Sequence, residues 1–167
     1  MIFENLLSSS AEFEEIYDAA KSSKFPISIS GISDSARVHI AYSLCRKLNK
    51  KLLFVTYSES NAKRLAEDCG FFFNNNTMVY PERELLFYDI AAAANDIRKT
   101  RLSVVDSVFS GKDVNIVTTI QALLSPTLDA KKYKENIIFL ENGADYDLET
   151  LSVKMTEFGY TRVDMVE

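Results

Sequence analysis

The sequence predicts an α/β fold, a parallel sheet with flanking helices, followed by the beginning of a small α+β lobe. Up to about Ser125, short apolar runs alternate with stretches in which apolar residues recur at helical spacing. This alternation is typical of parallel strands joined by right-handed helical crossovers. It breaks down in residues 127–136, a polar and lysine-rich stretch that indicates a connector. We therefore expect two parts, residues 1–125 and 126–167.

Caps and periodicity justify each expected element. Ser10 provides the cap of a first helix, with Phe13 and Ile16 on its apolar face. Further helices are expected at residues 34–48, from Ser60 or Asn61 to Gly70, and at 96–109, 120–124 and 147–158. Strands are expected at residues 27–30, 52–56, 78–80, 114–118, 137–140 and 160–166. The stretch 81–95 has no regular pattern.

The last expected strand reaches Glu167 without a turn. A free strand edge is a liability in a finished domain. We therefore expect the natural polypeptide to continue beyond this residue and the second lobe to be truncated.

Composition excludes several classes of protein. The net charge of −5 argues against a surface built mainly to follow nucleic-acid phosphates. Cys45 and Cys69 form no C-x-x-C pair, and His39 is the lone histidine, so we expect reduced, buried thiols in a cytoplasmic protein and no metal site. We find neither a membrane-spanning run nor a signal peptide.

A glycine turn between the first expected strand and its helix resembles a phosphate-binding loop. The segment Gly31-Ile-Ser-Asp-Ser-Ala-Arg-Val38 can be laid on the pattern G-x-x-x-x-G-K-[ST], but only the first glycine matches. Ala36 adds a Cβ, Arg37 replaces a compact lysine, and Val38 has no oxygen for Mg²⁺. Asp34 can cap the helix and repel an anion.

This segment leaves three interpretations open: an ordinary strand-turn-helix, a live nucleotide site, or a P-loop scaffold that no longer holds a nucleotide. We favour the third. We therefore expect neither binding nor hydrolysis of ATP at a useful level.

Several further segments occur in an order and spacing that is specific when taken together. They are Phe54-Val55 before residues 62–68, Tyr80-Pro-Glu-Arg-Glu-Leu-Leu-Phe-Tyr-Asp89, Arg101-Leu102, Val117-Thr-Thr-Ile-Gln-Ala-Leu123 and Gly159-Tyr-Thr-Arg-Val163. With the degenerate loop, they resemble the N-terminal, UvrB-homology region of the bacterial transcription-repair coupling factors, the Mfd family. The resemblance runs from about Ile27 to the C-terminus. It also extends to the related excision-repair protein UvrB.

Two departures from UvrB favour the coupling factors. UvrB keeps a working P-loop, and it carries an aromatic β-hairpin for which residues 81–95 are too short. The resemblance therefore implies a non-catalytic module that recruits the repair protein UvrA and contacts other domains of its parent. ATP and Mg²⁺ would serve only the parent's translocase domains, which act on DNA and displace stalled RNA polymerase. The alternatives are a nucleotide-binding P-loop enzyme and a DNA-binding module.

The candidate partner surface lies on the last expected strand. The resemblance implies a UvrA contact for Arg162 alone. Side chains alternate along a strand, so we expect Tyr160 and Asp164 beside it. Thr161, Val163 and Met165 would then share the opposite face and pack on helix 147–158. The alternative is a solvated strand with an Arg162–Asp164 ion pair of little energetic value.

Overall fold

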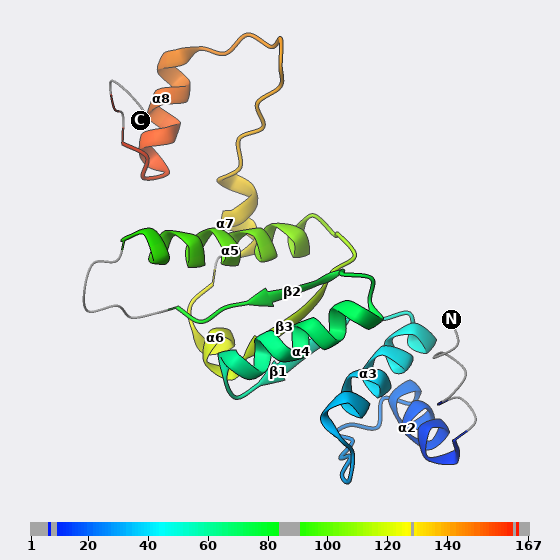
Figure 1. Cartoon of the computed structure of the whole chain (residues 1–167). Helices are drawn as coiled ribbons and strands as arrows, with labels where there is room; N and C mark the ends of the chain where they lie inside the picture. The colour runs from blue at the N-terminus through cyan, green and yellow to red at the C-terminus, as the bar shows by residue number, and fades with distance from the viewer. Residues whose placement is uncertain (1–6, 8–9, 84–90, 128, 162, 164–167) are drawn as a thin grey trace. The chain divides into compact units, whose positions relative to one another are not determined.

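The computed structural model describes residues 7, 10–83, 91–127, 129–161 and 163 (Figure 1). The chain divides into two compact units, Met1–Pro126 and Thr127–Glu167. Each unit is described by itself below.

The first unit is built on a three-stranded parallel sheet. Its strands are β1 (Leu53–Thr56), β2 (Thr77–Tyr80) and β3 (Asn115–Thr119), in the order β1-β3-β2. Both outer strands pair in parallel with β3, so that Val55 lies opposite Thr118 and Val79 lies opposite Val117. The predicted α/β fold with a parallel sheet and flanking helices is confirmed.

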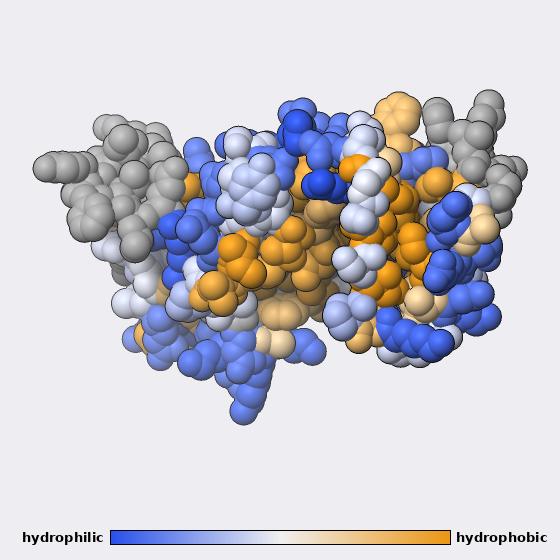
Figure 2. Space-filling model, turned by 90° about the horizontal axis from the view of Figure 1, so that it is seen from below, coloured by the Kyte–Doolittle hydropathy of each residue, from blue (hydrophilic) through white to orange (hydrophobic). Residues whose placement is uncertain are grey.

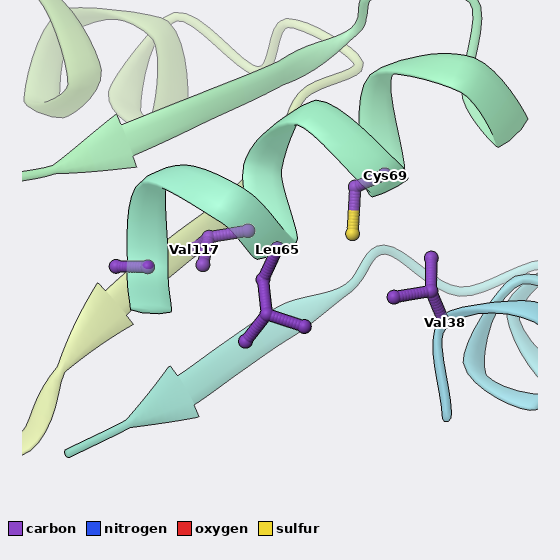
Figure 3. Close-up of a cluster of buried hydrophobic side chains, with 5 residues drawn as sticks. Val38, Leu65, Cys69 and Val117 are labelled. Atoms are coloured by element: carbon purple, nitrogen blue, oxygen red, sulfur yellow. The ribbon is translucent and has the colours of Figure 1, made fainter. Parts of the chain in front are cut away.

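One face of the sheet is covered by α4 (Glu59–Phe72), and α3 (Asp34–Leu48) packs against α4. Their buried side chains form one apolar cluster with β3, made of Val38, Ala62, Leu65, Cys69 and Val117 (Figure 3). Val38, Cys69 and Val117 have no solvent exposure at all. The cluster joins α3 to the sheet through α4.

The opposite face of the sheet carries α5 (Ala91–Phe109). Tyr80 and Val104 are buried there with Ala122 of α6 (Ile120–Leu124), the short helix that directly follows β3. Neighbouring residues of β2 belong to different clusters, because side chains alternate between the two faces of a strand. Thus Val79 packs on the α4 side, whereas Met78 and Tyr80 pack on the α5 side.

Serine side chains cap three consecutive helices that the structure describes in this unit. The Ser10 hydroxyl accepts the amide hydrogen of Phe13, so the predicted cap of α2 (Ala11–Lys21) is confirmed. The cap of α4 is Ser58, not Ser60 or Asn61. Its hydroxyl accepts from Asn61 N–H at 3.3 Å.

The predicted end of α4 at Gly70 is wrong. The helix continues to Phe72, because Phe72 and Phe73 pack against the apolar cluster. The left-handed turn that follows is made by Asn74 and Asn75, with φ of 53° and 60°. Asparagine tolerates this conformation better than most residues other than glycine.

Helix α2 lies against α3. Phe13 is buried, and Lys47 of α3 binds Glu14 with a distance of 2.5 Å between the charged atoms. The same ammonium lies 4.0 Å from the centre of the Tyr17 ring. An aromatic face and a carboxylate therefore hold one lysine between the two helices.

The strand predicted at residues 27–30 is wrong: these residues belong to no helix or strand. Phe25 and Ile29 nearby are 67% and 39% exposed. Helix α5 begins at Ala91, five residues before the predicted position 96. The Ala91-Ala-Ala-Ala94 run explains the difference, because alanine has the highest helix propensity.

The second unit contains α7 (Ala130–Glu135) and α8 (Leu148–Glu157). The predicted connector thus includes a helix, capped by Asp129 and anchored by the buried Tyr133. The strand predicted at 137–140 is wrong, since those residues pair with no other strand. In the part of this unit that the structure describes, no residue lies in a strand and α8 buries none of its side chains.

Candidate functional site

The glycine turn before α3 has the geometry of a helix start. Gly31 has φ of +74°, a left-handed conformation that favours glycine. Ser33 caps the helix, and its hydroxyl accepts the amide hydrogen of Ala36 at 3.4 Å. The prediction that Asp34 caps α3 is therefore wrong, because the residue before it takes that role. A backbone N–H that a P-loop would offer to phosphate here binds a serine.

Asp34 lies in the first turn of α3 and binds two arginines. Its carboxylate oxygens are 3.3 Å from Arg37 Nη1 and 2.7 Å from Arg64 Nη2. All three side chains are about half exposed, so the pairs contribute little to stability. They do direct both cations toward a carboxylate in the first turn of the helix.

Val38 occupies the position that a hydroxyl fills in the P-loop pattern. It is fully buried and points toward Leu65 and Cys69, as Figure 3 shows. A Mg²⁺ ligand at this position needs an oxygen that faces a water-filled loop. The side chain instead forms part of the apolar core.

Burial also suppresses thiol chemistry in this region. Desolvation raises the pKa of the Cys69 thiol to about 11, and burial raises the pKa of Cys45 as well. Both cysteines are free; Cys69 is buried, as expected, whereas Cys45 is only half-buried. The nucleophilic form of either thiol is therefore rare near neutral pH.

A buried arginine at the carboxyl end of the sheet has a role that the sequence did not reveal. Arg101 is 6% exposed and lies 4.1 Å from the ring centre of Tyr80. It donates to the carbonyl of Pro81 at 2.6 Å and to the hydroxyl of Ser125 at 3.1 Å. Desolvation lowers the pKa of its guanidinium. Arg101 thus ties the end of β2 to the end of α6.

Two carboxylates complete this polar cluster. The Thr119 hydroxyl donates to Glu82 Oε1 at 2.6 Å, and Glu82 N–H donates to Glu59 Oε1 at 2.9 Å. Because the protein itself satisfies these groups, the cluster holds the segment after β2 in place. In the sequence, three of the quoted motifs contain members of this cluster: Tyr80–Asp89, Arg101-Leu102 and Val117–Leu123.

The second unit places Tyr160 against the end of α8. Gly159 has φ of +86°, and the amide of Tyr160 donates to the carbonyl of Met155 at 3.0 Å. This bond turns the chain back over the last turn of α8, as helix C-caps do. The chain therefore does not leave α8 as an extended strand.

The predicted alternation of faces is not observed for the residues that can be described. Tyr160, which is 66% exposed, and Thr161 line the same groove of about 370 Å³ on α8. Val163 is 60% exposed, so the prediction that it packs on the helix is wrong. Arg162, Asp164 and Met165 lie outside the described residues.

Two kinds of feature are absent from the described part of the chain. No group of three or more His, Cys, Asp or Glu side chains in it is placed to hold a metal ion. None of its helices is both long enough and apolar enough to cross a membrane.

Comparison with known proteins identifies relatives of this chain among DNA-repair proteins. The chain is 26% identical over 139 residues to the transcription-repair-coupling factor of Bacillus subtilis (strain 168), a match that covers 83% of this chain and 12% of that relative. It is 26% identical over 159 residues to the UvrABC system protein B of Clostridium botulinum (strain Loch Maree / Type A3), covering 87% of this chain and 24% of the relative. The predicted resemblance is confirmed.

A more distant relative agrees with these two. The UvrABC system protein B of Metamycoplasma arthritidis (strain 158L3-1) is 20% identical over 146 residues, which cover 79% of this chain and 22% of that protein. No family model matches the chain. The chain spans less than a quarter of the length of these relatives. It is thus similar to the UvrB-homology region of DNA-repair proteins.

Proposed function

We propose that this chain is a non-catalytic, UvrB-like module of a longer transcription-repair coupling factor and that it recruits UvrA in nucleotide excision repair. The main support for the proposal is the structure of the P-loop-like turn before α3, in a chain that is similar to both the coupling factors and UvrB. Val38 is part of the core, Ser33 binds the Ala36 amide, and Asp34 holds the local arginines. A scaffold of this kind keeps the UvrB-like shape without the means to bind a nucleotide.

The remaining activities of such a protein belong to other parts of the polypeptide. ATP and Mg²⁺ would act in translocase domains, which would move along DNA and displace stalled RNA polymerase in the cytoplasm. Among the described residues, no cluster has the residue types that such ATP and Mg²⁺ sites need. The role of this module would be to present a surface to UvrA.

The second unit supplies the candidate surface. Tyr160 is an exposed aromatic residue two positions before Arg162 in the sequence, and aromatic residues and arginine are enriched in binding hot spots. Exposed apolar side chains of the same unit, Phe139, Leu148 and Val153, are 80%, 79% and 56% exposed. These side chains are the apolar groups that the proposed surface would offer to UvrA.

Titration of UvrA with the intact protein tests the proposal. We expect Arg162→Ala to weaken UvrA binding by about 1–3 kcal/mol and to leave the melting temperature nearly unchanged. Arg98→Ala is the matched control, because Arg98 is an exposed arginine on α5 of the other unit. Equal binding by both variants, or loss of folding in Arg162→Ala, would refute the role of Arg162. Failure of the unaltered protein to bind UvrA would refute the proposed function.

A further inference from the structure

A polar pocket of about 680 Å³ lies at the amino end of the sheet in the first unit. It is bounded by the C-terminal ends of α3 and α4 and by residues at or just before the starts of the three strands. The P-loop-like turn lies at the other end of α3, a helix of 15 residues, and so about 20 Å away. We call this cavity the basic pocket, after Arg46, Lys50 and Lys51, which line it.

The floor of the basic pocket is built from packed side chains. Tyr42 of α3 is 4% exposed, and its ring centre lies 5.5 Å from that of Phe72 and 5.1 Å from that of Phe73. Asn115 is also buried, and its side-chain amide accepts one backbone hydrogen bond at 2.8 Å and donates another at 3.2 Å. Because these groups hold one another in place, a ligand would meet a preformed floor.

The rim of the basic pocket is positively charged. Its described lining residues include the three cations and one carboxylate, Asp113. The Lys51 ammonium donates to the carbonyl of Lys112 at 2.5 Å and keeps two further N–H donors. Among the described residues, no ion pair joins a carboxylate to Lys50 or Lys51. Both lysines can therefore donate to a ligand.

This rim belongs to a basic stretch of an acidic chain. The chain has 24 Asp and Glu residues and a net charge of −5, yet residues 35–58 contain none of these acids. Hydrophilic residues border apolar ones on the side where α2 and α3 lie in Figure 1, as Figure 2 shows. Arg46 lies in the last turn of α3, where a cation offsets the helix dipole. Lys50 and Lys51 lie beyond the cap residue Asn49, where that effect has fallen off.

The lining residues favour carboxylates over nucleic-acid phosphates as the ligand. Both helices end at the pocket, so neither offers the backbone N–H groups of a helix N-terminus to a phosphate. The floor rings pack on one another, whereas proteins that hold single-stranded nucleic acid use aromatic rings on which bases stack. The side-chain amides of Asn49, Asn74 and Asn76 line the pocket and can donate to carboxylate oxygens beside the lysines.

We propose that the basic pocket binds an acidic peptide segment of a protein partner, with Asp or Glu side chains of the segment contacting Lys50 and Lys51. The complementary charge of the rim carries this inference. A short acidic segment brings a few carboxylates to the rim, whereas a nucleic acid carries a charge at every nucleotide and is repelled by the net charge of the chain. The site lies in the first unit and goes beyond the proposed UvrA surface, which belongs to the second.

Fluorescence anisotropy of a labelled peptide of alternating Glu and Gly, titrated with the intact protein, tests the proposal. We expect saturable binding that weakens as salt is added, and no binding of the matched peptide of Gln and Gly. Lys50→Ala combined with Lys51→Ala should weaken binding at least about tenfold. Lys63→Ala combined with Lys99→Ala is the control, because it removes the same charge from exposed positions on α4 and α5. Absence of saturable binding, or equal weakening by the two double variants, would overturn the proposal.

The Cys45 thiol locates the bound peptide, because Cys45 is free and lines the basic pocket. Saturating acidic peptide should slow alkylation of Cys45 by iodoacetamide several-fold, as measured by mass spectrometry. Unchanged alkylation would place the peptide elsewhere and overturn the proposal.

Two further results would overturn the proposal. One is tighter binding of a labelled oligothymidylate than of the acidic peptide, which would indicate a nucleic-acid site. The other is a lowered melting temperature of the Lys50 and Lys51 double variant with unchanged peptide binding, which would give these lysines a structural role alone. Arg162→Ala tests UvrA recruitment in the other unit, so the two proposals fail separately.

Discussion

The side chain at position 38 distinguishes a nucleotide-binding loop from a turn that packs into the core. In a P-loop the side chain at this position is a hydroxyl that faces Mg²⁺. Here it is a branched aliphatic group in contact with the apolar cluster of α4 and β3. The helix start has a glycine turn at Gly31, and position 38 is part of the packing.

Val38→Thr should destabilise the first unit by about 1–3 kcal/mol, because it buries a hydroxyl in an apolar cluster. Val108→Thr, at a side chain that is 45% exposed on α5, should change the free energy of unfolding by much less. Chemical denaturation of both variants measures the difference. Equal stabilities would show that Val38 is not the core residue described above.

Arg101 is the second residue with a decisive role. Arg101→Met should cost about 2–3 kcal/mol, because two hydrogen bonds from a charged donor are lost and the Pro81 carbonyl is left without its partner. The exposed Arg98→Met is the control, with an expected change below about 0.5 kcal/mol. Denaturation curves for Arg101→Met and Arg98→Met test this prediction. A small effect of Arg101→Met would contradict it and would mean that water replaces the hydrogen bonds of Arg101.

Cys69 makes stability depend on pH in the alkaline range. Its pKa is raised from 9.0 to about 11 in the folded protein, so the unfolded thiol ionises first. The stabilising contribution is therefore complete below pH 9 and is lost as the pH rises from about 9 through about 11. The difference in unfolding free energy between the unaltered protein and Cys69→Ala should shrink over this range. A constant difference would contradict the shift.

At the level of elements, local signals predicted most helices and the three strands of the sheet, but they did not show which apolar runs lack a partner strand. Helices α2 and α3 were predictable because a serine cap and an apolar face lie within the same stretch of sequence. Residues 27–30 and 137–140 have suitable side chains but no partner strand in the structure, and a strand requires a neighbour to bond with. Arg101 could not be assigned a role, because its partners lie 20 and 24 residues away in sequence.

The cap of α4 gives a prediction at this scale. Ser58→Ala should destabilise the protein by about 1 kcal/mol, because the Asn61 amide loses its acceptor. Ser103→Ala, on the exposed surface of α5, should be neutral or slightly stabilising, since alanine favours helix. Thermal unfolding of the two variants separates the cap from a general effect of removing a hydroxyl.

At the level of the whole molecule, the sequence predicted the class of fold and the related families but not the geometry of the partner surface. The motifs from Gly31 to Val163 indicated the resemblance that the comparisons confirm. The alternation assumed for residues 160–166 did not anticipate the turn at Gly159, where a C-cap bond to Met155 redirects the chain. The assignment of Arg162 to a UvrA contact stays a prediction.

The central claim is that this UvrB-like unit no longer binds a nucleotide, and calorimetric titration with Mg·ATP tests it most directly. The core position of Val38, the Ser33 cap and the Asp34 carboxylate each remove or oppose a phosphate or Mg²⁺ contact. We predict no saturable heat up to millimolar Mg·ATP, with UvrB as the positive control because the resemblance implies that it keeps a working P-loop. Saturable binding of Mg·ATP with micromolar affinity would contradict the account.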